Sequence, residues 1–143
     1  MATTQDAIET LHRENCSCVI LKDNETSAFR GPGISDLLRI LKTEPDKLKD
    51  AFVADKVIGK AAAALLILGE VEGVYADLIS ESAIKLLRRY HIEVTFAEQI
   101  AVILNRAKDD VCPMEKICSE QTEPKLCYER INEFIASKNN KPQ

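Results

Sequence analysis

The chain has 143 residues, 45% of them hydrophobic and 29% charged, which is the balance of a single globular domain over 1–143. This composition excludes a disordered chain, and no window approaches the roughly 18 uninterrupted apolar residues of a membrane-spanning helix. Nineteen basic and twenty-three acidic residues give a net charge of −4. We therefore expect neither a nucleic acid nor a membrane as partner.

The N-terminal residues and the cysteines indicate a reducing compartment. Residues 1–15 mix acidic, basic and polar side chains without the apolar segment of a secretory signal. Five cysteines, an odd count, argue against a secreted disulfide framework, so we expect a cytoplasmic protein. Neither the cysteines nor the two histidines have the spacing of a zinc site, so we expect no metal and no cofactor. Cys16, Cys18 and Cys127 are expected to be buried thiols that pack as small hydrophobic groups.

The first third of the chain predicts a helix, a hairpin of strands and two further helical segments. The expected elements are a helix over 4–14, strands over 16–22 and 26–30, a helix between Ser35 and Pro45, and a short helical turn over 46–52. The next segment, 54–69, is apolar on all sides after Lys60 and is followed by Gly69, which predicts one buried helix. In such a helix Lys56 and Lys60 share one face, because they lie four residues apart.

The rest of the chain alternates strands with helices. The expected elements are a strand over 73–79, a helix over 82–90, a strand over 92–96, a helix or a short strand within 97–107, a helix over 123–137 and a frayed polar tail over 136–143. Strand–helix–strand units with such connections predict parallel pairing. The predicted fold class is therefore α/β, a three-layer α/β/α sandwich with a mixed sheet that begins with an antiparallel hairpin.

Four motifs carry a resemblance to a known family. They are Ala54–Ala63, Ile79-Ser80-Glu81, Asn105-Arg106 and Cys112-Pro113-Met114-Glu115. In combination they resemble an uncharacterised bacterial and archaeal family, a domain of unknown function assigned to the cytidine-deaminase-like fold. The likeness covers about residues 5–135, and it implies that fold for this chain.

The resemblance does not extend to deaminase chemistry. Active deaminases carry His-x-Glu or Cys-x-Glu at the start of the central helix and Pro-Cys-x-x-Cys at the start of the next, which hold the zinc and move protons. Here the corresponding positions read Gly59-Lys60-Ala61 and Ser80-Glu81-Ser82-Ala83. Since both the ligands and the acid are replaced, we do not expect a zinc-dependent deaminase.

The replacement residues at the central helix suggest an anion site. Lys56, Gly59 and Lys60 are all unfavourable there, because cations are disfavoured in the first turn of a helix and glycine in its interior. Free backbone N–H groups, the helix dipole and a lysine ammonium could together bind a phosphate or a carboxylate. In the alternative interpretation Asp55 caps the helix, Lys56 lies in solvent and Gly59 permits close packing. The segment is not a P-loop, since Ala54 stands at the first glycine position.

Cys112 and Glu115 are the candidate catalytic residues. If Pro113 opens a helix, Cys112 is its N-cap, where the helix terminus lowers the pKa of a thiol. The thiolate could act as a nucleophile while Glu115 moves protons. The alternative is that Cys112 packs and Glu115 only offsets the helix dipole, since no histidine pairs with the thiol. Asn105 and Arg106 add polar recognition groups nearby.

The topology predicts that Asp55, Gly59 and Lys60 meet Ser80 and Glu81 in one cleft, because ligands of α/β sheets collect where parallel strands end and helices begin. The family resemblance adds the Cys112–Glu115 segment to this cleft. The expected ligand-binding residues are Asp55, Lys56, Gly59, Lys60, Ser80, Glu81, Asn105 and Arg106. The function that follows is metal-independent binding of an anionic small molecule, a class that includes nucleotide-like compounds. The alternative is a Cys112-dependent enzyme that acts on a nucleotide-like substrate. The sequence also permits a homo-oligomer.

Overall fold

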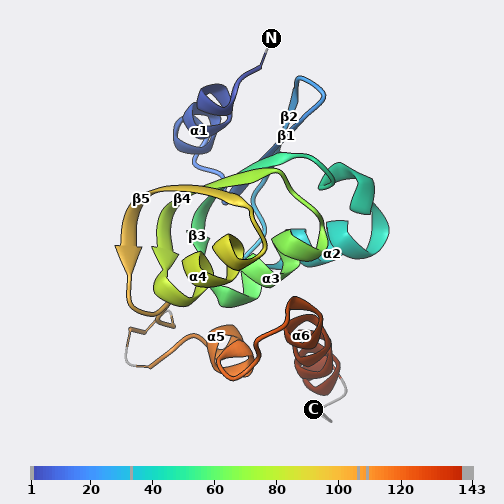
Figure 1. The fold of residues 1–143 in the computed structure, drawn as a ribbon, viewed down its shortest axis with the longest axis vertical. Helices are drawn as coiled ribbons and strands as arrows, with labels where there is room; N and C mark the ends of the chain where they lie inside the picture. Colours follow the sequence, from blue (N-terminus) through green and yellow to red (C-terminus); the bar gives the residue numbers. More distant parts are fainter. Residues whose placement is uncertain (1, 33, 106, 109, 140–143) are drawn as a thin grey trace.

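The computed structural model describes residues 2–32, 34–105, 107–108 and 110–139, and a five-stranded mixed sheet forms its centre (Figure 1). The strands are β1 (Cys18–Lys22), β2 (Glu25–Phe29), β3 (Phe52–Ile58), β4 (Gly73–Ser80) and β5 (Glu93–Ile100). They lie in the order β2-β1-β3-β4-β5, with β1 antiparallel to both β2 and β3 and with β3, β4 and β5 parallel. The predicted α/β class, the mixed sheet and the N-terminal hairpin are confirmed.

The hairpin is closed by a two-residue turn. Asp23 and Asn24 have φ values of 51° and 67°, the left-handed conformation that a tight hairpin turn requires. Aspartate and asparagine adopt this conformation more readily than other residues with a Cβ. The turn therefore fixes the register of β1 and β2, in which Lys22 pairs with Glu25.

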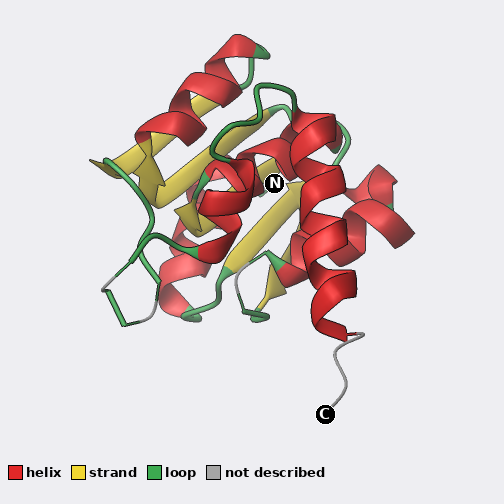
Figure 2. Cartoon of the chain, turned by 90° about the horizontal axis from the view of Figure 1, so that it is seen from below, coloured by secondary structure: helices red, strands yellow, loops and turns green. Residues whose placement is uncertain are grey.

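Helices cover both faces of the sheet. Their bounds are α1 (Thr4–Arg13), α2 (Ser35–Thr43), α3 (Lys60–Leu68), α4 (Glu81–Arg89), α5 (Pro113–Cys118) and α6 (Pro124–Asn139). On one face α1 packs Ala7 and Leu11 against Val19 and Ala54. The opposite face carries α2, α3 and α4, with α5 and α6 outside them, and Figure 2 shows these helices lying across the strands. No helix among the described residues is both long and apolar enough to cross a membrane.

The segment 52–69 differs from its predicted single helix. Residues 52–58 form β3, the central strand, and α3 begins only at Lys60 with Gly59 as its N-cap. Asp55 therefore does not cap a helix, and Lys56 does not share a helical face with Lys60. Pairing with β1 on one side and β4 on the other stabilises the strand despite the two charged residues at its centre. The predicted helical turn over 46–52 is also wrong, since only a 3₁₀ turn over Pro45–Lys47 precedes the strand.

Two further differences lie in the second half of the chain. β5 continues to Ile100, and no helix occurs among the described residues of 101–107, where an isolated bridge joins Leu104 to Val111. α6 includes residues 136–139, part of the tail that we expected to be frayed, and 140–143 lie outside the described residues.

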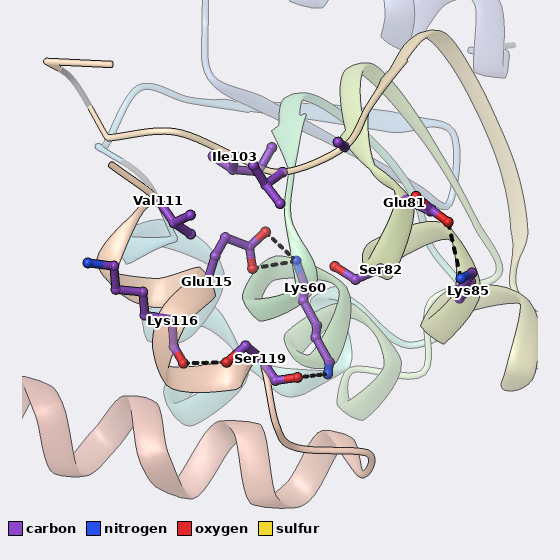
Figure 3. A pocket seen from close by; sticks show the side chains of 11 residues that line it. Lys60, Glu81, Ser82, Lys85, Ile103, Val111, Glu115, Lys116 and Ser119 are labelled. Atoms are coloured by element: carbon purple, nitrogen blue, oxygen red, sulfur yellow. Dashed lines mark hydrogen bonds and ion pairs between the residues drawn. The ribbon is translucent and has the colours of Figure 1, made fainter. Parts of the chain in front are cut away.

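One edge of the sheet gathers the segments that carry the candidate residues. The parallel strands β3 and β4 end there, at Ile58 and Ser80, and α3 and α4 begin directly after them. Because β1 is antiparallel to β3 and pairs Cys18 with Asp55, the start of β1 lies at the same edge. The loop after β5 and helix α5 complete this region of the molecule (Figure 3).

Candidate functional site

A carboxylate of the protein itself occupies the N-terminus of α3. The backbone N–H of Lys60 donates to both carboxylate oxygens of Glu115, at 2.7 and 2.9 Å (Figure 3). Glu115 is only 8% exposed, and this burial raises its pKa, although the backbone N–H groups of Lys60 and Ala61 act in the opposite direction. The helix terminus that we expected to bind an external anion is therefore filled by Glu115.

Gly59 permits this contact. A Cβ at this position would lie 1.9 Å from Oε1 of Glu115 and 3.0 Å from Cγ1 of Ile103. The φ of Gly59 is −97°, which any residue can adopt, so the requirement for glycine is steric. We expected a ligand to approach the backbone closely at Gly59, and in the structure the Glu115 carboxylate does so.

Two cavities share Glu115 and Ile103 in their lining. The larger, of about 530 Å³, lies between the starts of α3 and α4 on one side and α5 on the other (Figure 3). Its lining residues are Lys60, Glu81, Ser82, Lys85, Ala101, Val102, Ile103, Val111, Glu115, Lys116 and Ser119. The ammonium of Lys116 points away from the cavity toward Asp110, with which it forms an ion pair.

A smaller cavity of about 200 Å³ continues the first one, because both are lined by Lys60, Ser82 and Lys85. It adds Arg89, and none of the described residues that line it is acidic. We call the two cavities together the Lys60 groove. Its charged and hydroxyl side chains come from the start of α3, from successive turns of α4, and from α5 and the residues that follow it.

Four cationic side chains line the Lys60 groove among the described residues, and two of them, Lys60 and Arg89, are held by neutral partners. Nζ of Lys60 donates to the backbone carbonyl of Ser119 at 3.2 Å, and Nη1 of Arg89 donates to that of Thr122 at 3.2 Å. Neither side chain forms an ion pair with another described residue. Lys85 does pair with Glu81, at 3.1 Å, but both side chains are more than half exposed, so this pair is weak.

The second cavity, of about 340 Å³, is called here the Asp55 pocket. Its lining residues are Ser17, Gly31, Pro32, Ile34, Asp55, Lys56, Val57, Gly59, Ala61, Ala62, Ile103, Cys112, Met114 and Glu115. Burial raises the pKa of Asp55 from 3.8 to about 7, against the lowering effect of the Val57 and Lys56 backbone N–H groups, and nearby Asp77 raises it further. A carboxyl group with this pKa can exchange a proton near neutral pH.

The structure places the predicted site residues around two cavities rather than in one cleft. Asp55, Lys56, Gly59, Cys112 and Glu115 line the Asp55 pocket, and Lys60, Glu81 and Glu115 line the Lys60 groove. Cys112 is the N-cap of α5, as predicted, and Pro113 is its first residue. The ammonium of Lys56 is bound by the side-chain oxygen of Asn15.

Two of the predicted residues that the structure describes line neither cavity. Ser80 is 1% exposed, and its hydroxyl accepts the backbone N–H of Ala83 at 3.2 Å as the N-cap of α4, so its role is structural. Asn105 lies in the loop after β5, where its backbone N–H donates to the carbonyl of Asp110. Arg106 lies outside the described residues.

The sequence interpretation missed Ser17, Ser82, Lys85 and Arg89. The signal for two of them is visible in the sequence: Glu81, Lys85 and Arg89 follow one another at intervals of four and therefore share a face of α4. Ser17 carries no such signal, because only the register of β1 against β3 brings it to the Asp55 pocket.

The cysteines and acidic residues do not form a metal cluster in the described part of the chain. No three His, Cys, Asp or Glu side chains there lie close enough together to hold an ion. Cys16, Cys18 and Cys127 are buried free thiols, as predicted, and Cys118 is buried as well. The thiols of Cys118 and Cys127 hydrogen-bond to each other between α5 and α6.

A family model described as a domain of unknown function, DUF1893, matches residues 6–135. The chain belongs to the DUF1893 family. A solved structure of a DUF1893 family protein from Thermotoga maritima is 22% identical in sequence, with a TM-score of 0.84 over 93% of this chain and 92% of that one. This DUF1893 protein therefore shares the fold of that structure. No curated protein matches this chain.

Proposed function

We propose that this DUF1893 protein binds a small, multiply charged anion in the Lys60 groove, without a metal. One observation carries the proposal: in a protein of net charge −4, Lys60, Lys85 and Arg89 line two adjoining cavities that share Lys60, Ser82 and Lys85. Lys60 and Arg89 donate to backbone carbonyl groups, and Arg89 also lies over the ring of Tyr90, so an incoming anion would meet charges that form no ion pair with a described carboxylate.

The chemistry of the groove suits phosphate groups. A guanidinium binds two phosphate oxygens at once, while lysine ammonium groups add charge without a fixed direction. The hydroxyl of Ser82 lies among these cations and could donate a further hydrogen bond. A volume of about 530 Å³ is within the usual range for small-molecule sites and leaves room for an organic part, so nucleotide-like compounds belong to the class.

The scaffold that we propose for this groove is a cytidine-deaminase-like fold with a replaced zinc site. The motifs that carry the family resemblance support it, because Gly59-Lys60 and Ser80-Glu81-Ser82 stand at the starts of two neighbouring helices. In the active deaminases those starts carry the zinc ligands. In this chain they contribute a lysine, a capping serine and a second serine to the surroundings of the groove.

Calorimetric titration with inorganic pyrophosphate tests the proposal. We expect wild-type protein to bind it, and Lys60→Ala and Arg89→Ala each to weaken binding by about tenfold, the loss typical of a charge-assisted hydrogen bond. Lys42→Ala is the matched control, since Lys42 is an exposed lysine of α2 that lines neither cavity. Absence of binding to the wild type, or equal affinity in all four proteins, would overturn the proposal.

The second candidate is the Cys112-dependent enzyme acting on a nucleotide-like substrate. It is favoured by the placement of Cys112 and Asp55 around the same cavity, where Asp55 could accept the thiol proton. Alkylation by iodoacetamide tests it at pH 7: the candidate requires fast labelling of Cys112 and slower labelling in Asp55→Asn. Labelling at the rate of a free cysteine in both proteins would exclude this role. A cytoplasmic location and a homo-oligomer stay predictions.

A further inference from the structure

The Asp55 pocket is lined mainly by apolar side chains. Its hydrophobic lining comes from α3, the loop before α2, the end of β3 and the segments around α5: Pro32, Ile34, Val57, Ala61, Ala62, Ile103 and Met114. The two alanines of α3 have short side chains, so they leave open space above the helix. A cavity of about 340 Å³ with such walls fits a planar ring better than a strongly hydrated ion.

The polar side chains in this pocket accept hydrogen bonds. Oδ1 of Asp55 accepts the backbone N–H of Val57 at 3.2 Å, and each carboxylate oxygen has room for a further donor. The single hydroxyl proton of Ser17 is directed to the carbonyl oxygens of Phe29 and Gly31, at 2.9 and 3.0 Å, so toward a ligand its oxygen can only accept. Glu115 adds a second carboxylate.

The pocket has one cationic side chain among its described residues, and that cation is engaged elsewhere. Lys56 lines the pocket, but its ammonium is bound by Asn15. An entering molecule therefore meets two carboxyl groups and one accepting hydroxyl oxygen, with no lysine or arginine left to neutralise them. Such a set of acceptors complements a donor that carries positive charge.

We propose that the Asp55 pocket is a second binding site, for a planar cation that donates N–H hydrogen bonds, such as an amidinium, a guanidinium or a protonated amino-heterocycle. The ring lies between the apolar walls, and its N–H groups donate to Asp55 and to Oγ of Ser17. This site is independent of the proposed anion groove, because Lys60, Lys85 and Arg89 do not line it. The two sites have opposite charge preferences.

Three probes of similar shape and different charge test the proposal. We expect benzamidine to bind the wild-type protein, neutral benzamide to bind about tenfold more weakly, and benzoate to give no measurable binding. Asp55→Asn should weaken benzamidine binding by about tenfold. Asp46→Asn is the matched control, since it removes the same charge from an exposed residue that does not line the pocket.

The outcomes separate this site from the proposed anion groove. Lys60→Ala should leave benzamidine binding unchanged while it weakens pyrophosphate binding. Amide chemical shifts of the wild type, which need no variant to fold, should move on benzamidine addition at Ser17, Ala61, Ala62 and Met114. Equal affinity for benzamidine and benzamide, equal loss in Asp55→Asn and Asp46→Asn, or shifts confined to other residues would overturn the proposal.

Discussion

Both carboxylate oxygens of Glu115 accept the backbone N–H of Lys60, and they reach it because residue 59 has no Cβ. The contact joins α5 to the N-terminus of α3, although the two residues are 55 positions apart in the chain. It also places a negative charge where the helix dipole favours one. Glu115 thus acts as a built-in anion between the Lys60 groove and the Asp55 pocket.

The first prediction concerns Gly59→Ala. A methyl group there would displace the Glu115 carboxylate, which would lose its hydrogen bonds to the Lys60 N–H. The N-terminus of α3 would lose its acceptor at the same time. The free energy of unfolding should therefore fall by about 1–3 kcal/mol. Urea denaturation measures this change. Gly73→Ala is the control, because a Cβ at Gly73 would meet its nearest atom, the carbonyl oxygen of Glu93, at an ordinary 3.5 Å. A loss in Gly59→Ala no larger than that in the control would contradict the steric account.

The second prediction concerns Glu115→Gln. The substitution removes a negative charge from the lining of the Lys60 groove while it keeps an oxygen that can accept the Lys60 N–H. Affinity for pyrophosphate should therefore rise by about three- to tenfold, as expected for one charge removed near the protein surface. Calorimetry measures the effect, and Glu120→Gln provides the same charge change at an exposed residue that lines neither cavity. Unchanged or weaker binding in Glu115→Gln would show that Glu115 does not oppose the anion.

The third prediction concerns the pH dependence of stability through Asp55. Its pKa in the folded protein, about 7, is above the ordinary 3.8, so the folded state binds the proton more tightly. The resulting stabilisation is complete below about pH 4 and is lost as the pH rises through 7. At about 1.4 kcal/mol per pKa unit, the loss approaches about 4 kcal/mol.

Asp55→Asn isolates this contribution, because its side-chain oxygen can still accept the Val57 N–H but does not titrate. The unfolding free energy of the wild type should fall relative to that of the variant between pH 4 and 8. The charged and titratable groups around Asp55 are Cys18 on β1, Lys56 beside it, Asp77 on β4, and Cys112 and Glu115 across the pocket. They remain in both proteins, so two parallel stability curves would contradict the raised pKa.

Secondary structure was predicted correctly where the sequence pattern is typical of only one kind of element. The hairpin is recognisable because two short strands flank Asp23 and Asn24, residues that suit a tight turn. The segment 54–69 was misassigned because Val57 and Ile58 run into the apolar residues of α3 without a clear break. Only pairing with β1 and β4 decides that Asp55 and Lys56 belong to a central strand, and such pairing is a property of the whole fold.

For the candidate site, the sequence indicated which segments lie near one another, and the structure adds contacts that no sequence pattern shows. The ends of parallel strands indicated the region of Gly59 and Lys60, and the family resemblance added Cys112 to it. No sequence pattern indicates that Glu115 reaches the N-terminus of α3, because the contact depends on how α5 packs after a long loop. Arg89 was not predicted as a site residue, because the apolar residues of its helix indicate only the face that is buried.

The most direct test of the anion site is a titration of isotope-labelled protein with pyrophosphate, monitored through the amide chemical shifts in NMR spectra. We predict saturable shifts at Lys60, Ser82, Lys85 and Arg89, and at Thr122, whose carbonyl holds the Arg89 guanidinium. The shifts should be absent from the exposed lysine-bearing surface of α2 around Lys42. Shifts spread over lysines throughout the surface, or no saturable shift in the Lys60 groove, would contradict the claim that this protein has a specific anion site.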